Sequence, residues 1–324
     1  MKIKTAISYN LDLLCFINVM TGRKFFTDYH KDSFEKFYPA ISDNVKGRIN
    51  RVMKLGFTSI GTAITMPISS VDDFNDKNLM KMLKDKTGLK KSMKNKASVY
   101  ITGINALLVR ILIGRVIVPL VEELERAGFK EFWQTNRLSL IQERCNDVDK
   151  YMERYNPKEL LDRYINFSGS DFIVYICSFA RPHGIKLCGN NMIADIAHEN
   201  DSILEILTHE VFHPPYDKRK VKQSLKSLGN MPWVQKAYKN QNPDMRYRPI
   251  AGFIEENIVE ALGIYVAVQL GLDIDPKKYF EEHDEGSHVI SPYFYDYLCK
   301  NEKDVTISFE EYFDKFVDAL VAKI

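Results

Sequence analysis

Cysteines are few in this sequence, and their spacing does not suggest a structural framework. There are five in 324 residues, an odd number, widely spaced and without a Cys-x-x-Cys pair. This distribution argues against a small secreted fold stapled by disulfides and favours a reducing cytoplasm. The positions are Cys15, Cys145, Cys177, Cys188 and Cys299.

The chain also lacks an excess of charge of either sign. Its formal net charge is +2, with 45% hydrophobic and 27% charged residues, which is ordinary for a globular protein. Composition therefore gives no electrostatic reason to expect nucleic acid or an anionic membrane as a partner.

No long apolar run is free of charge. The strongest one, residues 101–121, contains Arg110 and Arg115, and two arginines near the centre of a bilayer would be costly. We expect a buried helix there and not a membrane span. The first apolar stretch is interrupted by Asn10 and Asp12, so it makes a poor secretory signal. A cytoplasmic location is the expectation.

The chain shows no internal repeat and no linker rich in Pro, Gly or Ser. Residues 1–165 are predicted to be mostly helical, with helices at residues 104–125 and 136–154 as examples. Residues 166–324 are predicted to form a second region, which begins with strands and ends in helices. The two regions could also form one continuous domain. The expected fold class is α+β, mostly helical, with a small sheet next to a helix that carries two histidines.

The sheet is expected within residues 172–196. Residues 172–179 are β-branched and aromatic, which is typical of a strand. Residues 181–184 resemble a turn, and residues 185–196 form a second extended stretch with a possible bulge at residues 189–191.

Three helices are expected after the strands. The first is capped by Asn200 or Asp201 and runs to His213, where two prolines stop it. The others are predicted at residues 253–270 and 309–322.

The most informative motif is His209-Glu210-Val211-Phe212-His213. Two histidines at i and i+4 project from one face of a helix, so both imidazoles can reach one divalent cation. Glu210 can then approach a water bound to that cation. This is the HExxH arrangement of a zinc hydrolase.

A catalytic zinc site needs a third protein ligand, and one later helix offers it. Glu256 and Glu260 stand at i and i+4 in a segment that is apolar nearly all round and therefore expected to be buried. Buried carboxylates must be paired, hydrogen-bonded or metal-bound. Gly263 and Ala267 share the stripe of these glutamates and would let another helix come close.

The chain resembles a zincin metallopeptidase of the gluzincin type over residues 172–270. The resemblance implies that Glu256 is the third ligand and that Glu260 orients a ligand histidine, although Glu255 competes with Glu256. Two features depart from related patterns. Pro214 ends the first helix early, and Tyr216 and Arg219 stand where the extended metzincin motif expects glycine and histidine.

Cys188 is a rival third ligand, because peptide deformylases combine a thiolate with two HExxH histidines. The residues around Cys188 do not match the cysteine motif of that family. A buried structural cysteine is the preferred interpretation.

The mechanism implied by the resemblance is hydrolysis of peptide bonds by a zinc-activated water, with Glu210 as the general base. A further donor should stabilise the tetrahedral oxyanion. We expect His288 or Tyr293 in this role, from an irregular segment after the ligand helix, with Tyr247 and Tyr216 as further candidates.

The predicted function is therefore that of a zinc-dependent peptidase with a peptide or protein substrate. Residues 189–196 could bind that substrate as an edge strand through main-chain pairing. One alternative is a zinc amidase or deformylase that acts on a small substrate. Another is a non-catalytic zincin-like binding or regulatory protein, which a fourth protein ligand closing the metal site would favour.

Overall fold

The computed structural model describes residues 2–56, 59–96, 103–165, 171–182, 184–241, 247 and 249–323. It divides into two compact units. The sheet unit comprises residues 2–154 and 171–200, and the histidine unit comprises residues 155–170 and 201–324, as far as these are described.

This division does not follow the predicted boundary near residue 165. The segment with the predicted strands clusters with the N-terminal half, because β2 (Phe172–Cys177) pairs with a strand at the start of the chain, β1 (Ile3–Ala6). The sequence did not predict β1, which is short and precedes a long run of helices.

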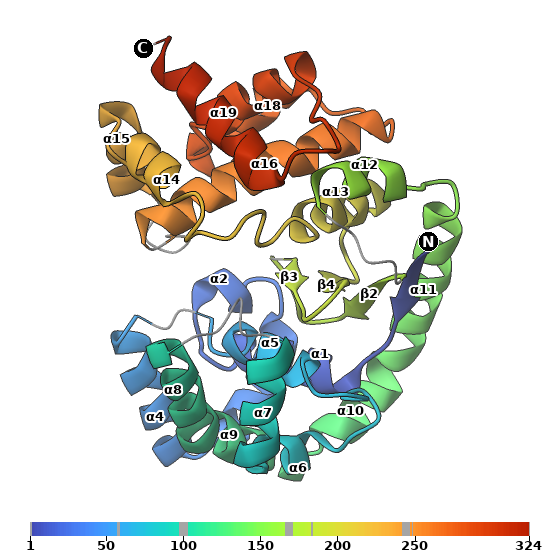
Figure 1. Cartoon of the computed structure of the whole chain (residues 1–324). Helices are drawn as coiled ribbons and strands as arrows, with labels where there is room; N and C mark the ends of the chain where they lie inside the picture. The colour runs from blue at the N-terminus through green and yellow to red at the C-terminus, as the bar shows by residue number, and fades with distance from the viewer. Residues whose placement is uncertain are drawn as a thin grey trace. The chain divides into compact units, whose positions relative to one another are not determined.

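The sheet has four strands in the order β1-β2-β4-β3 (Figure 1). β1, β2 and β4 (Asn191–Asp195) are parallel, while β3 (Ile185–Lys186) is antiparallel to β4. Helices α1 (Tyr9–Val19) and α11 (Leu138–Met152) pack against these strands. The small sheet and the mostly helical chain confirm the predicted α+β class. The expected position of the sheet next to the histidine helix stays a prediction.

The predicted strand at 172–179 is confirmed as β2, but residues 185–196 form a hairpin and not one bulged strand. Gly189 takes a left-handed φ of 72°, and the Leu187 N–H donates to the Asn191 carbonyl oxygen at 2.9 Å, which closes the turn. β4 lies between β2 and β3, so the expected edge strand at 189–196 is wrong: its strand residues are in the interior of the sheet. His183 of the predicted turn lies outside the described residues.

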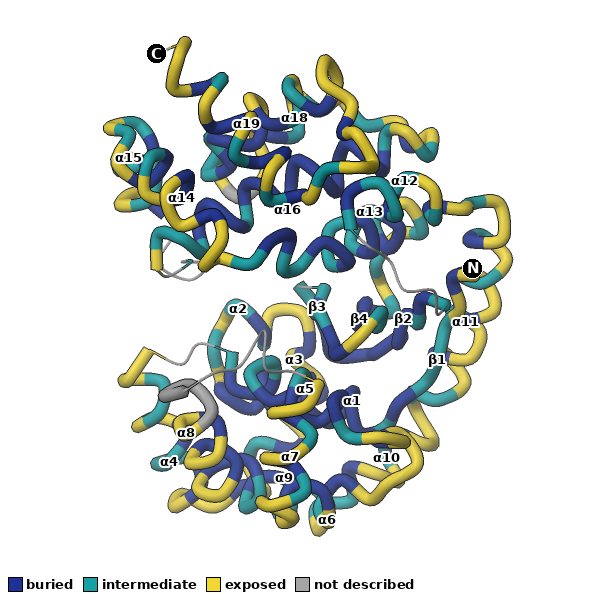
Figure 2. The backbone as a smooth tube through the Cα atoms, viewed as in Figure 1, coloured by how far each residue is buried: buried dark blue, intermediate teal, exposed yellow. Residues whose placement is uncertain are grey.

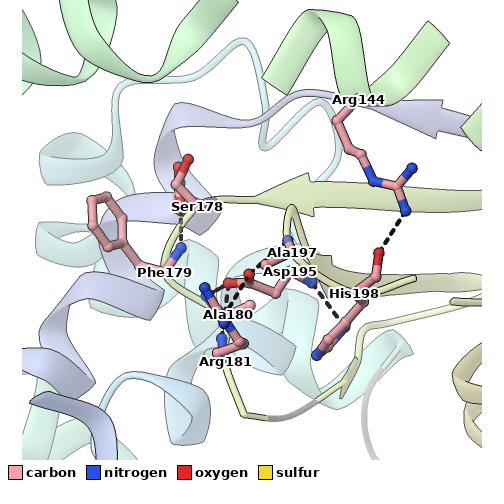
Figure 3. A network of polar contacts seen from close by, with 9 residues as sticks. Arg144, Ser178, Phe179, Ala180, Arg181, Asp195, Ala197 and His198 are labelled. Atoms are coloured by element: carbon pink, nitrogen blue, oxygen red, sulfur yellow. Dashed lines mark hydrogen bonds and ion pairs between the residues drawn. The ribbon is translucent and has the colours of Figure 1, made fainter. Parts of the chain in front are cut away.

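A buried polar network holds the loop that follows β2 (Figure 3). Asp195, at the end of β4, is fully buried, and its Oδ2 accepts from the backbone N–H groups of Ala180 and Arg181, each at 2.9 Å. Asp12 of α1 accepts from the N–H groups of Ser178 and Phe179 through one oxygen. These bonds satisfy two buried carboxylates and fix the ends of the strands.

The other helical segments of the sheet unit are mostly short. They are α2 (Lys24–Thr27), α3 (Lys31–Phe37), η1 (Tyr38–Ala40), α4 (Asp43–Lys54), α5 (Thr62–Ser69), α6 (Leu79–Lys84), α7 (Lys86–Lys96), α8 (Gly103–Leu112), η2 (Ile113–Ile117), α9 (Val118–Arg126) and α10 (Phe129–Asn136).

The apolar run at 101–121 forms α8, a π-helical turn η2 and the start of α9, and its first two residues lie outside the described part. The predicted helix is present, but only one face is buried: Ile117 is fully buried, whereas Leu107 is 55% exposed. None of the helices in the described ranges has the length and apolar character needed to cross a bilayer.

The histidine unit is built around α16 (Ile250–Gln269), which is buried over most of its length (Figure 2). Its apolar side chains continue on nearly every face, as the sequence predicted. Helices α14 (Lys222–Gly229) and α18 (Ser291–Lys300) pack against it and cover these side chains. The other elements are α12 (Lys158–Tyr164), α13 (Asn200–Glu210), α14 (Lys222–Gly229), α15 (Pro232–Asn240), α17 (Pro276–Glu282), η3 (His283–Gly286), α18 (Ser291–Lys300) and α19 (Phe309–Val321).

Candidate metal centre

The first histidine lies in the last turn of α13, and the second lies just beyond it. The helix ends at Glu210 and not at His213 as predicted. The tighter turn that follows has the Phe212 N–H bonded to the His209 carbonyl at 3.1 Å and the His213 N–H bonded to the Glu210 carbonyl at 3.3 Å. Pro214 explains the early end, because a residue before proline is disfavoured in the α conformation.

α16 crosses α13 at very short range, and Gly263 makes this possible. A Cβ atom at position 263 would lie 3.0 Å from the Cα and 3.1 Å from the backbone nitrogen of His209. The expected close approach at the small residues of α16 is therefore confirmed for Gly263. It brings the glutamates of α16 to the imidazoles.

We expect Gly263→Ala to lower the free energy of unfolding by about 1–3 kcal/mol, because the added methyl group must push the His209 backbone away. Gly252→Ala is the matched control in the same helix, since a Cβ there meets nothing within 4 Å. The control should be neutral or stabilise the protein by up to about 1 kcal/mol. Urea unfolding measures both variants. Equal effects of the two substitutions would contradict the close crossing.

Three ligand atoms converge from α16 and the end of α13. The Nε2 atoms of His209 and His213 lie 3.1 Å apart. Glu256 Oε1 is 3.2 Å from His209 Nε2, and its Oε2 is 3.7 Å from His213 Nε2. Two ligands bound tetrahedrally to zinc at about 2.0–2.1 Å are roughly 3.3 Å apart. The observed separations are close to this spacing. The three side chains form one of the candidate metal-binding groups, with one ligand atom of each within 4.8 Å of the others.

The electrostatics of this group favours a positive charge between its atoms. Burial lowers the pKa of His209, but the carboxylates of Glu260 and Glu256 outweigh that effect and raise it well above its usual value. Burial raises the pKa of Glu256, and the neighbouring imidazoles of His213 and His209 overcome this and hold it at about 2. A site with these shifts attracts protons or a cation, and a metal ion competes with protons for the same atoms.

Each of the two histidines has a carboxylate near its Nδ1 atom. His209 Nδ1 donates to Glu260 Oε2 at 2.7 Å, which leaves Nε2 to face His213 and Glu256. His213 Nδ1 lies 3.6 Å from Glu255 Oε1, and Glu255 is also paired with Lys218. Carboxylates in this outer position orient ligand histidines and raise their basicity. The arrangement places Glu256 with the ligand atoms and Glu255 behind His213, so Glu256 is the better candidate for third ligand.

The group is partly open to solvent. The side chains of His209 and His213 are each 18% exposed, and that of Glu256 is 14% exposed. Among the residues that the structure describes, the group has three members. Three protein ligands with access for solvent are typical of catalytic zinc sites, whereas structural sites have four. Glu210 follows His209 directly and is partly exposed at the end of α13.

The residues predicted to stabilise an oxyanion fall in different places. His288 is buried beside Glu260, which is on the Nδ1 side of His209, away from the converging Nε2 atoms. Tyr293 is 51% exposed, and its ring lies 5.4 Å from that of Trp233. The role of His288 or Tyr293 as the oxyanion donor stays a prediction.

The two further candidates also differ. The backbone N–H of Tyr247 donates to Gln241 Oε1 at 2.9 Å, which fixes the main chain there. Tyr216 is buried against Phe313, and burial together with the charge of Glu255 raises the pKa of its hydroxyl well above the usual value. The Tyr216 hydroxyl therefore lies close enough to Glu255 for that carboxylate to raise its pKa, and it stays protonated at neutral pH.

Cys188 belongs to the sheet unit and has partners of its own. Its backbone N–H donates to Ser69 Oγ at 2.9 Å, and its Sγ lies 3.5 Å from the Lys96 carbonyl oxygen. Burial raises the pKa of this thiol, which disfavours the thiolate that metal binding requires. The preferred interpretation of a buried structural cysteine agrees with these contacts.

Sequence reasoning missed three residues close to the site. Glu205, one turn before His209 on α13, accepts a hydrogen bond from the Tyr279 hydroxyl at 2.6 Å. The Tyr279 ring stacks on that of His283, with 4.6 Å between centroids. The i to i+4 relation of Glu205 and His209 was a usable signal for the first residue. Tyr279 and His283 come close to the site only through the tertiary fold of the chain after α16, which no local pattern predicts.

Searches against models of protein families, curated proteins and solved structures found no match for this chain. The geometry of the site is therefore the basis for the proposed function.

Proposed function

We propose that the protein is a zinc-dependent peptidase, with His209, His213 and Glu256 as the metal ligands. The observation that carries the proposal is the convergence of two imidazole nitrogens and one carboxylate, at 3.1–3.7 Å from one another. These distances are close to the spacing of ligands around a tetrahedral ion. Two imidazoles and a carboxylate suit zinc among the common divalent metals. The carboxylates behind both histidines add support, because such partners are typical of metal sites.

Zinc bound there would supply positive charge that acidifies a water molecule and polarises a carbonyl group. Glu210 would take the proton from the attacking water and deliver it to the departing amine, as a general base and then a general acid. Glu260 would hold His209 in the tautomer that leaves Nε2 unprotonated, through the 2.7 Å contact at Nδ1.

The proposed substrate is a peptide or protein, and the proposed setting is the cytoplasm, on the pattern of the cysteines. An intact glutamate between the histidines supports catalysis over a purely structural role, which needs no base at Glu210. His288 or Tyr293 is the proposed donor for oxyanion stabilisation, with Tyr216 and Tyr247 as further candidates.

The proposal is tested with the full chain and a mixture of peptides, with products read by mass spectrometry. The zinc-loaded protein should cleave peptides, a chelator should stop cleavage, and one equivalent of zinc should restore it. Cleavage by protein verified to be free of metal would contradict the proposal. Stoichiometric zinc without cleavage of any peptide would also overturn it, in favour of a binding protein or an amidase for small substrates.

A further inference from the structure

A second cluster of metal-type ligands lies in the histidine unit, behind the first. It consists of Glu260, His283 and His288, whose ligand atoms all lie within 4.8 Å of one another. Glu260 is 5% exposed and His288 1%, whereas His283 is exposed. Two ligands of the cluster are therefore buried and the third faces solvent. A cation can enter from the solvent side.

We propose that this cluster is a second binding site for a divalent cation of the zinc type. Two imidazoles and one carboxylate form the same donor set as at the first site, and that set favours zinc over magnesium or calcium, which prefer oxygen ligands. The inference stands without the proposed peptidase activity, because it concerns other histidines.

The fold holds the loop of the second site in place. Asn257 of α16 is 1% exposed, and its Oδ1 accepts from the Ile290 N–H at 2.8 Å. The Ser291 hydroxyl donates to the Asn257 carbonyl oxygen at 2.7 Å. Because Asn257 lies about one turn before Glu260, these bonds fix the loop two residues after His288 against the same part of α16.

Neighbouring groups restrict the other two ligands. The Tyr279 ring stacks on His283 with 13° between the planes, and the Tyr279 hydroxyl is held by Glu205. The rings of His283 and His288 have centroids 5.6 Å apart. Side chains that are held before a cation arrives lose less entropy when it binds.

Glu260 is shared by the two sites. Its Oε2 accepts from His209 Nδ1 at 2.7 Å, and a carboxylate has a second oxygen and further lone pairs. The second site thus uses a residue that orients a ligand of the first. We expect the second cation to bind more weakly, because one of its ligands is exposed and Glu260 already serves His209.

The test is zinc stoichiometry of the full chain, dialysed against buffered free Zn²⁺ and measured as metal per protein by mass spectrometry. The wild type should bind two equivalents. His283→Ala, which removes an exposed side chain, and the double variant His283→Ala/His288→Ala should each bind one. His213→Ala, the reciprocal control, should lose the first site and keep the second. Thermal unfolding confirms that each variant is folded.

Wild-type protein that binds one equivalent, unchanged in the double variant, would overturn the second site and leave the first untouched. Two equivalents in both proteins would also overturn it, because the second zinc would then lie elsewhere. One equivalent that His213→Ala keeps and His283→Ala loses would support the second site while contradicting the proposed catalytic one.

Discussion

Replacing Glu210 by glutamine should lower the rate of peptide cleavage by about 10²–10⁴-fold, which is the usual contribution of a general acid–base residue. Glutamine keeps the shape of glutamate but cannot accept the proton of water at neutral pH. Glu210 is not among the three converging ligands, so zinc content should stay at the wild-type value. The measurement is kcat/KM on a cleaved peptide, together with metal per chain.

The matched control is Glu159→Gln, which changes an exposed glutamate on α12 of the same unit. It should leave both cleavage and zinc unchanged. A Glu210→Gln protein that cleaves at the wild-type rate would remove Glu210 from the mechanism. Loss of zinc in this variant would instead mean that Glu210 is a ligand.

A large loss of zinc binding is expected when Glu256, the proposed third ligand, is replaced. Glu256→Ala should lose the zinc of the first site, because it removes the carboxylate that lies 3.2 Å from His209 Nε2. Glu255→Ala should retain zinc but bind it about 10–100-fold more weakly, the usual cost of losing a partner behind a ligand. Both variants alter neighbouring glutamates of one helix, so a general effect of mutating α16 would appear in both.

Cys188→Ala completes this comparison and should bind zinc as the wild type does. Competition with a chromophoric chelator gives the affinities. Equal zinc affinities of the Glu255 and Glu256 variants would contradict the assignment of Glu256 as the ligand. A large loss in Cys188→Ala would favour the thiolate alternative instead.

Much of the candidate site follows from local sequence. The i to i+4 spacing sets the direction of His209 and His213, and the same spacing separates Glu256 from Glu260 on α16. The direction survives although α13 ends at Glu210, because the tighter turn after it still brings the Nε2 atoms within 3.1 Å. The lack of a Cβ at Gly263 was a signal for the close crossing, and the structure uses it in this way.

The parts that sequence did not predict depend on contacts distant along the chain. The residues of Ile3–Ala6 carry no signal that they pair with Phe172–Cys177. The sequence therefore does not predict that residues 171–200 belong to the same unit as the N-terminal half. The position of His288 beside Glu260 depends on Asn257, which is far away in sequence and holds the loop of His288 against α16. A glycine favours both a bulge and a hairpin turn, so the sequence alone does not distinguish the two at Gly189.

The central claim is that two imidazoles and the carboxylate of Glu256 bind one zinc ion. The most direct measurement is zinc K-edge X-ray absorption of the full chain carrying His283→Ala/His288→Ala, which removes the second proposed site, loaded with one equivalent of zinc. We predict a first shell of nitrogen and oxygen alone at about 2.0–2.1 Å, with outer scattering from two imidazoles that falls when His213 is replaced by alanine. A sulfur neighbour at about 2.3 Å, or a spectrum unchanged by His213→Ala, would contradict the account.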